Sequence, residues 1–249
     1  MNKHAELMLQ QLEDEQLLGS ESSKAALLPF QDEKHKSHGQ KRWAGDEALQ
    51  LVQQVFFHQR QEPPRVVVFA GIEHGNGCSQ ICASVTEILA KAARGPVSLV
   101  DANFRSPALP GLFGKTNHRG LTDALLQGGP ISSFVQLATE GNLWLLPSGP
   151  LTSDSPSLLG SEEFRERLEE LRQACDFVVI DAPPLTQYSD AIALARLSDG
   201  VVLVLEADST RLEAASAVTA NLRSLKVPIL AAVLNKHSFP IPQRILGRL

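Results

Sequence analysis

The sequence has no long apolar run, few cysteines and no excess of positive charge, and each of these absences excludes a class of protein. A membrane-spanning helix needs about 20 consecutive apolar residues, and no run approaches that length. The acidic, polar N-terminus MNKHAELMLQQLEDEQ is unlike a secretory signal. Three cysteines without regular spacing argue against a disulfide framework, and a net charge of −5 argues against a broad nucleic-acid surface. We therefore expect a cytoplasmic protein that reaches the inner face of the plasma membrane only through a partner.

What the sequence does contain is an alternation of apolar strands and helical segments between residues 43 and 236. Continuous apolar strands separated by helices are typical of a parallel sheet covered on both faces, so we expect a doubly wound, mostly parallel α/β fold. The pattern is broken around Pro107 and Pro110, where we expect irregular chain. Residues 1–42 predict an amphipathic helix over 4–18, either loosely docked or used to dock a partner, followed by a polar linker. Residues 237–249 form a short tail.

The stretch RVVVFAGIEHGNGCS, residues 65–79, predicts a strand, a glycine-rich turn and the start of a helix. This is the setting of a phosphate-binding loop, in which backbone N–H groups at a helix N-terminus face phosphate oxygens. Gly77 and Ser79 agree with the pattern G-x-x-x-x-G-K-[ST], but Cys78 occupies the lysine position and Ile72 the first glycine position. The loop has the shape of a nucleotide site and lacks its main positive charge.

Two further predicted strands end in acidic residues that could complete such a site. The strand over 97–100 ends at Asp101, and the strand over 176–181 ends at Asp181. In phosphate-loop proteins a loop hydroxyl binds Mg²⁺ and an Asp from another strand end holds the metal's waters. Ser79 and Asp181 are therefore the predicted magnesium ligands if a nucleotide binds.

Residues 44–236 resemble the bacterial tyrosine kinases (BY-kinases) of capsule and exopolysaccharide synthesis, which are P-loop NTPase-like relatives of the ParA/MinD group. LVDANFRSP resembles the family's second Walker motif, and the long block ending in FVVIDAPP is similar to its Walker B region. The resemblance implies ATP or ADP with Mg²⁺ as ligand, and Asp101 and Asp181 as catalytic residues if the protein is active. It implies nucleotide-binding roles for Gly75, Asn76, Gly77, Cys78, Ser79, Gln80 and Asn235, the last near the adenine.

The sequence departs from the family at functional positions. Besides Cys78 at the lysine position, Asn103 occupies the position of the second acidic residue in the LVDANFRSP motif. The two arginines of the motif used for ring self-association are replaced by Gln50 and Gln53. The family's C-terminal tyrosine cluster is missing, and the single tyrosine is Tyr188. These losses affect catalysis, self-association and the phosphate acceptor together.

We therefore interpret the chain as a degenerate BY-kinase-like protein that regulates exopolysaccharide assembly with weak or no catalysis. Its expected partners are a membrane-anchored chain-length or export protein or an active kinase paralogue, and it would form at most a weakened homo-oligomer. One alternative is an active kinase or ATPase that takes its missing charge from Arg105 or from a partner. Another is a ParA/MinD-like partitioning protein, which Ile72 opposes because it lies where that group's signature lysine would be.

Cys78 has alternatives of its own. A thiol at a helix N-terminus has a lowered pKa, which would make Cys78 a reactive thiolate, with Cys82 one turn further along. The simpler interpretation is that a small residue replaced a lysine that was no longer needed, and we favour it.

Overall fold

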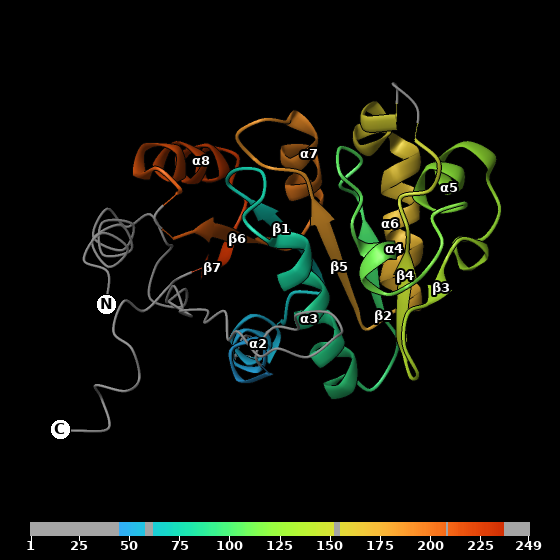
Figure 1. The fold of residues 1–249 in the computed structure, drawn as a ribbon. Helices are drawn as coiled ribbons and strands as arrows, with labels where there is room; N and C mark the ends of the chain where they lie inside the picture. The colour runs from blue at the N-terminus through green and yellow to red at the C-terminus, as the bar shows by residue number, and fades with distance from the viewer. Residues whose placement is uncertain (1–44, 58–61, 152–154, 208, 237–249) are drawn as a thin grey trace.

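The computed structural model describes residues 45–57, 62–151, 155–207 and 209–236 (Figure 1). The predicted N-terminal helix, the polar linker and the C-terminal tail lie outside the described residues. Figure 1 shows a single twisted sheet with helices on both of its faces. The described residues form seven strands: β1 Val66–Gly71, β2 Val97–Asp101, β3 Gln136–Leu137, β4 Leu143–Leu146, β5 Phe177–Ala182, β6 Gly200–Glu206 and β7 Ile229–Asn235.

The strand order is β3-β4-β2-β5-β1-β6-β7. Every neighbouring pair is parallel except β3 and β4. The order places β1 at an inner position between β5 and β6, as expected of a doubly wound sheet. The predicted fold class is therefore confirmed. The antiparallel edge strand β3 was not predicted, because two residues carry no readable periodicity.

The helices form two layers, one on each face of the sheet. They are α2 Gly45–Val52, which continues into the π-helical turn η1 Gln53–Phe57, then α3 Cys78–Ala92, α4 Leu109–Leu112, α5 Leu121–Gln127, α6 Glu162–Ala174, α7 Ser189–Leu197 and α8 Leu212–Ser224, with 3₁₀ turns η2 Ile131–Ser133 and η3 Ser155–Gly160. One hydrophobic cluster joins α2, α3 and α4 to alternate strand residues such as Phe69 and Val179. The other joins α5, α6, α7 and α8 to the intervening strand residues, such as Val68 and Ile180.

Local chemistry explains where two of the helices begin. Helix α6 starts as its sequence predicts, because the Ser161 hydroxyl caps it by accepting the Phe164 N–H at 3.2 Å. The expectation of irregular chain around Pro110 is wrong for residues 109–112, which form α4. Proline is compatible with a helix start because its missing N–H has no partner there in any case. The Asp101 side chain adds support by accepting the Leu109 N–H at 3.1 Å.

Candidate functional site

The glycine-rich loop connects β1 to α3 at the carboxyl edge of the sheet, where ligands bind in this architecture (Figure 1). Gly75 and Gly77 have φ values of 84° and 82°, a left-handed conformation that favours glycine. Gly77 is the N-cap of α3, so the first helical N–H groups belong to Cys78, Ser79 and Gln80. Ile72, at the position of the motif's first glycine, is fully buried. The sequence therefore builds the turn of a phosphate loop with an apolar residue at its base.

The loop is tied to the strands on one side of β1 by three side chains. Asn76 is buried, and its Nδ2 donates to the Val204 carbonyl at 2.8 Å. Asn235, at the end of β7, donates from Nδ2 to the Asn76 carbonyl at 2.6 Å. Lys236 donates from Nζ to the Gly75 carbonyl at 2.7 Å and forms an ion pair with Glu206 at 3.0 Å. These contacts hold the loop backbone against the ends of β6 and β7.

On the other side of β1 lie the two predicted acidic residues. Asp101 and Asp181 are fully buried and occupy matching positions on the paired strands β2 and β5. The pKa of Asp181 is raised to about 7. Burial raises it, and the nearby Ser79 hydroxyl and Cys78 thiol partly offset this effect. Burial, and then the charge of Asp181, raise the pKa of Asp101 well above its ordinary value, although backbone N–H groups including that of Leu109 lower it. The structure thus places two carboxyl groups where ionisation is costly.

Three oxygens of this acidic pair have no hydrogen-bond partner within the described structure: Asp101 Oδ1 and both carboxyl oxygens of Asp181. Ser79 and Cys78 face Asp181 without reaching full hydrogen-bond geometry. Buried polar atoms are normally paired, so unpaired carboxyl oxygens indicate a place for a cation or its water ligands.

Cys78 lies against Asp181 at the start of α3 and is 9% exposed. Burial and the neighbouring Asp181 raise the pKa of the Cys78 thiol well above its usual range. Burial and the same carboxyl also raise the pKa of Cys82. The pKa directions oppose the reactive-thiolate alternative, because desolvation outweighs the helix N-terminus here. A neutral thiol stands where the motif has a cation.

Several residues singled out in the sequence have structural partners. Arg105 forms an ion pair with Asp190 at 3.0 Å and lies over the Tyr188 ring, 4.6 Å from its centroid. Asn103 closes a turn, because both its carbonyl and its Oδ1 accept the Ser106 N–H, at 3.1 and 3.3 Å. Arg105 therefore already has an acidic partner, and Asn103 contributes to the shape of the loop after β2.

The structure brings together the loop residues Gly75 to Ser79 with Asp181 and Asn235, while Gln80 is exposed. Sequence reasoning missed Lys236, whose Nζ contacts the loop although it is far away in the sequence. Its position directly after Asn235 was the available signal. Sequence reasoning also missed that the Asn76 side chain is turned inward, where it is buried and donates to the Val204 carbonyl.

Judged by these contacts, the site fits part of a magnesium–nucleotide complex. Ser79 and Asp181 supply a hydroxyl and a carboxylate, groups that can bind Mg²⁺ beside phosphate oxygens, and neither Asp181 oxygen has a hydrogen-bond partner within the described ranges. Asn235 Oδ1 is also buried and has no hydrogen-bond partner among the residues that the structure describes, so it offers an acceptor for an amino group such as that of adenine. The phosphate end fits poorly, since Cys78 replaces the lysine and offers no charge.

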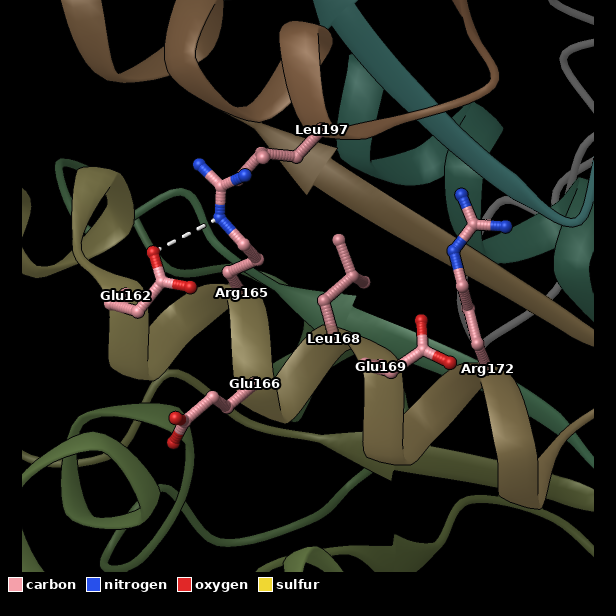
Figure 2. Close-up of a pocket in the computed structure, with 7 residues that line it drawn as sticks. All are labelled: Glu162, Arg165, Glu166, Leu168, Glu169, Arg172 and Leu197. Carbon is pink, nitrogen blue, oxygen red and sulfur yellow. Dashed lines mark ion pairs between the residues drawn. The ribbon is translucent and has the colours of Figure 1, made fainter.

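A separate pocket of about 360 Å³ lies on α6, near the end of α7 (Figure 2). It is lined by Glu162, Arg165, Glu166, Leu168, Glu169, Arg172 and Leu197. Figure 2 shows Arg165 directed toward Glu162, with which it pairs at 3.2 Å, and both side chains are more than half exposed. None of the predicted site residues lines this pocket. It is an open surface groove with charges of both signs, in contrast to the buried acids beside the loop.

A glycine turn that leads from an inner parallel strand into a helix, with buried acids on neighbouring strand ends, defines the P-loop NTPase-like class. YwqD of Bacillus subtilis (strain 168), a tyrosine-protein kinase, is 33% identical over 169 residues, which are 66% of this chain and 71% of YwqD. The chain belongs to the bacterial tyrosine kinase (BY-kinase) family, which confirms the resemblance seen in the sequence.

Two further comparisons extend this result. ExoP of Rhizobium meliloti (strain 1021), a succinoglycan biosynthesis transport protein, is 27% identical over 175 residues, 69% of this chain but only 22% of ExoP. The kinase domain of the Escherichia coli tyrosine kinase ETK has a TM-score of 0.76 at 20% identity over 93% of this chain and 96% of its own, a likeness of fold alone. No protein-family model matches the sequence. Within the four described ranges, no helix is long and apolar enough to cross a membrane.

Proposed function

We propose that this chain is a degenerate BY-kinase that regulates exopolysaccharide or capsule assembly with little or no phosphoryl transfer of its own. The observation that carries the proposal is the neutral Cys78 thiol beside Asp181, at the position of the motif's lysine. Phosphoryl transfer depends on positive charge near the transferred group. Beside Cys78 lie two buried carboxyl groups, whose raised pKa values favour their neutral forms, and the Lys236 ammonium at Gly75 is paired with Glu206.

The pathway is proposed from the relatives. YwqD is a tyrosine-protein kinase, and ExoP is a transport protein of succinoglycan biosynthesis that is much longer than this chain. ExoP is a transport protein, and a chain similar to part of it would contact a membrane-anchored polysaccharide export protein. We propose such a protein, or an active kinase of the same family, as the partner.

The runner-up function is an active ATP-dependent tyrosine kinase or ATPase. Asp101 and Asp181, the acidic residues that match the family motifs, favour this function. Within the described residues, three of their carboxyl oxygens are unpaired, which suits a magnesium-bound ligand. Its missing charge would come from a partner or from Arg105, which is already paired with Asp190.

Calorimetry with Mg-ATP and Mg-ADP separates the two functions, with phosphate release measured on the same samples. The proposal expects weak or undetectable binding by the wild type and no turnover. In the variant Cys78→Lys it expects tighter binding by roughly 1.5–3 kcal/mol, the size of one charge-assisted contact to phosphate. Cys175→Ala is a suitable control, because Cys175 is a buried cysteine at the end of α6, away from the loop. Micromolar affinity and steady phosphate release by the wild type would instead establish the active enzyme.

A further inference from the structure

We infer that Asn76 is an internal ligand of the phosphate loop, occupying with its side-chain oxygen an N–H group that a phosphate would otherwise bind. Asn76 Oδ1 accepts the Cys78 N–H at 3.2 Å, while Nδ2 of the same side chain is fixed by the Val204 carbonyl at 2.8 Å. The inference rests on the proposed function, because it concerns the affinity of the same loop.

The position of this side chain is set by its surroundings. Asn76 is 3% exposed, and it lies so close to Gly71 that a Cβ at residue 71 would be 2.1 Å from Asn76 Nδ2. A Cβ on Gly77 would in turn lie 2.3 Å from Nδ2 of Asn235, which donates to the Asn76 carbonyl. Two glycines therefore leave room for two asparagine side chains, and one of them reaches the start of α3. The contact is held by packing on both sides.

The chemistry of the contact is that of a weak anion substitute. Cys78 is the first helical residue after the N-cap Gly77, so its N–H has no partner within the helix. A carboxamide oxygen satisfies this donor without bringing a negative charge into a space that already holds Asp101 and Asp181. A phosphate must displace that oxygen and face the same carboxyl groups. Asn76 therefore lowers the affinity of the loop for phosphate, independently of the missing lysine.

The unpaired acceptors around the loop show that it is only partly satisfied from within. Asn235 Oδ1 and both Asp181 oxygens are buried and have no hydrogen-bond partner in the described part of the chain. The Cys78 N–H is satisfied by a side chain, whereas these acceptors remain available to a ligand. The Asn76 side chain thus blocks the phosphate position of the site. The positions beside Asp181 and beside Asn235 Oδ1 stay available to a ligand.

The test uses the full chain and inorganic pyrophosphate as probe, in the wild type, Asn76→Ala, Cys78→Lys and the double variant. If Asn76 competes with the probe, removing it tightens pyrophosphate binding about fivefold or more in both backgrounds, the equivalent of one neutral hydrogen bond. Asn76→Asp, which keeps the shape and adds a negative charge, weakens binding. Asn117→Ala is the matched control, because Asn117 also anchors a loop, through Ser148 and Gly149, and lies outside this site.

A second measurement follows the amide of residue 78 by NMR. In Asn76→Ala this amide proton exchanges faster and shifts upfield, and pyrophosphate reverses both changes. Weaker binding by Asn76→Ala would overturn the inference, because it would mean that Asn76 only anchors a competent loop. Equal affinities, an unchanged amide or no pyrophosphate binding by any variant would overturn it as well. Rapid ATP turnover by the wild type would instead remove the proposed function and leave the comparison of affinities intact.

Discussion

Asp101 and Asp181 stand directly opposite each other on the parallel strands β2 and β5, both fully buried. Opposed carboxyl groups in an apolar setting cannot both ionise cheaply, because each charge is desolvated and repels the other. The pair therefore favours binding of a proton or of a cation. It makes the stability of the fold depend on pH in a direction that can be measured.

The first prediction concerns that pH dependence. The pKa of Asp181 is about 7 in the folded protein and 3.8 ordinarily, so the folded state binds the extra proton between these values. The contribution of Asp181 to the free energy of unfolding is therefore greatest below about pH 4 and is lost as the pH rises towards 7. Asp181→Asn should flatten this dependence and stabilise the protein at pH 8 by a few kcal/mol, at roughly 1.4 kcal/mol for each pKa unit. Urea unfolding from pH 5 to pH 8 measures both effects, and a variant less stable at pH 8 would contradict them.

The Cys78→Lys variant should change the same profile by a different route. A lysine ammonium beside Asp181 favours the ionised carboxyl, so the pKa of Asp181 falls and the loss of stability between pH 5 and pH 8 becomes smaller. Unfolding of this variant over the same pH range checks the prediction without any nucleotide. Cys82→Ala, a change one helical turn away without added charge, should retain the wild-type slope.

Asp199 should make stability depend on pH in the opposite direction to Asp181. Burial raises its pKa, but hydrogen bonds from Arg172, Val66 and Arg65 outweigh this effect and lower the pKa below its ordinary value. Its contribution to stability is present above about pH 4 and is lost as the pH falls further. Asp199→Asn should lower the free energy of unfolding by on the order of 1 kcal/mol at pH 7, a value reduced for partial exposure. The difference in this free energy between the variant and the wild type should become smaller as the pH falls. A difference that is constant with pH would mean that the charge contributes nothing.

Phosphotyrosine analysis tests the functional proposal from the acceptor side. Tyr188 is the only tyrosine of the chain, and Arg105 covers one face of its ring. The wild type alone with Mg-ATP should accumulate no phosphotyrosine by mass spectrometry. Any signal formed with an active kinase present must map to Tyr188 and disappear in Tyr188→Phe. A signal from the chain alone that is lost in Asp181→Asn would show instead that the protein is a working kinase.

Alkylation of cysteine provides the last test. The three thiols are buried, and burial raises the pKa of each one, to about 11 for Cys175. Iodoacetamide near neutral pH should therefore label the native protein slowly, because the thiolate is the reacting form. The same reagent in urea should label all three quickly. Fast labelling of native Cys78 alone would revive the reactive-thiolate alternative.

The fold could be predicted from the sequence because its strands are continuous apolar runs. Val66–Gly71 and Phe177–Ala182 are buried along their whole lengths, so hydrophobicity alone locates them. The parallel order then places Asp101 and Asp181 at one edge of the sheet. Helix α4 and strand β3 were not predicted, because four and two residues are too short for a periodic signal.

The details of the candidate site were less predictable. A sequence pattern locates a glycine-rich loop but does not give the direction of the Asn76 side chain, which depends on left-handed glycines and on room above Gly71. The contact of Lys236 with the Gly75 carbonyl joins distant parts of the chain. Packing between strands sets such contacts, and the only sequence signal for Lys236 was its position beside Asn235.

The position of β1 in the strand order has a consequence for how a ligand would be noticed. Asp101 and Asp181 lie on β2 and β5, on one side of β1. Asn235 ends β7 and Lys236 follows it, on the other side of β1. Any molecule that contacts both groups acts as a non-covalent cross-link between the two wings of the sheet. Its binding would raise the melting temperature in proportion to the logarithm of its concentration, even if no chemistry followed. Thermal denaturation with candidate ligands is thus a direct screen for what this site holds.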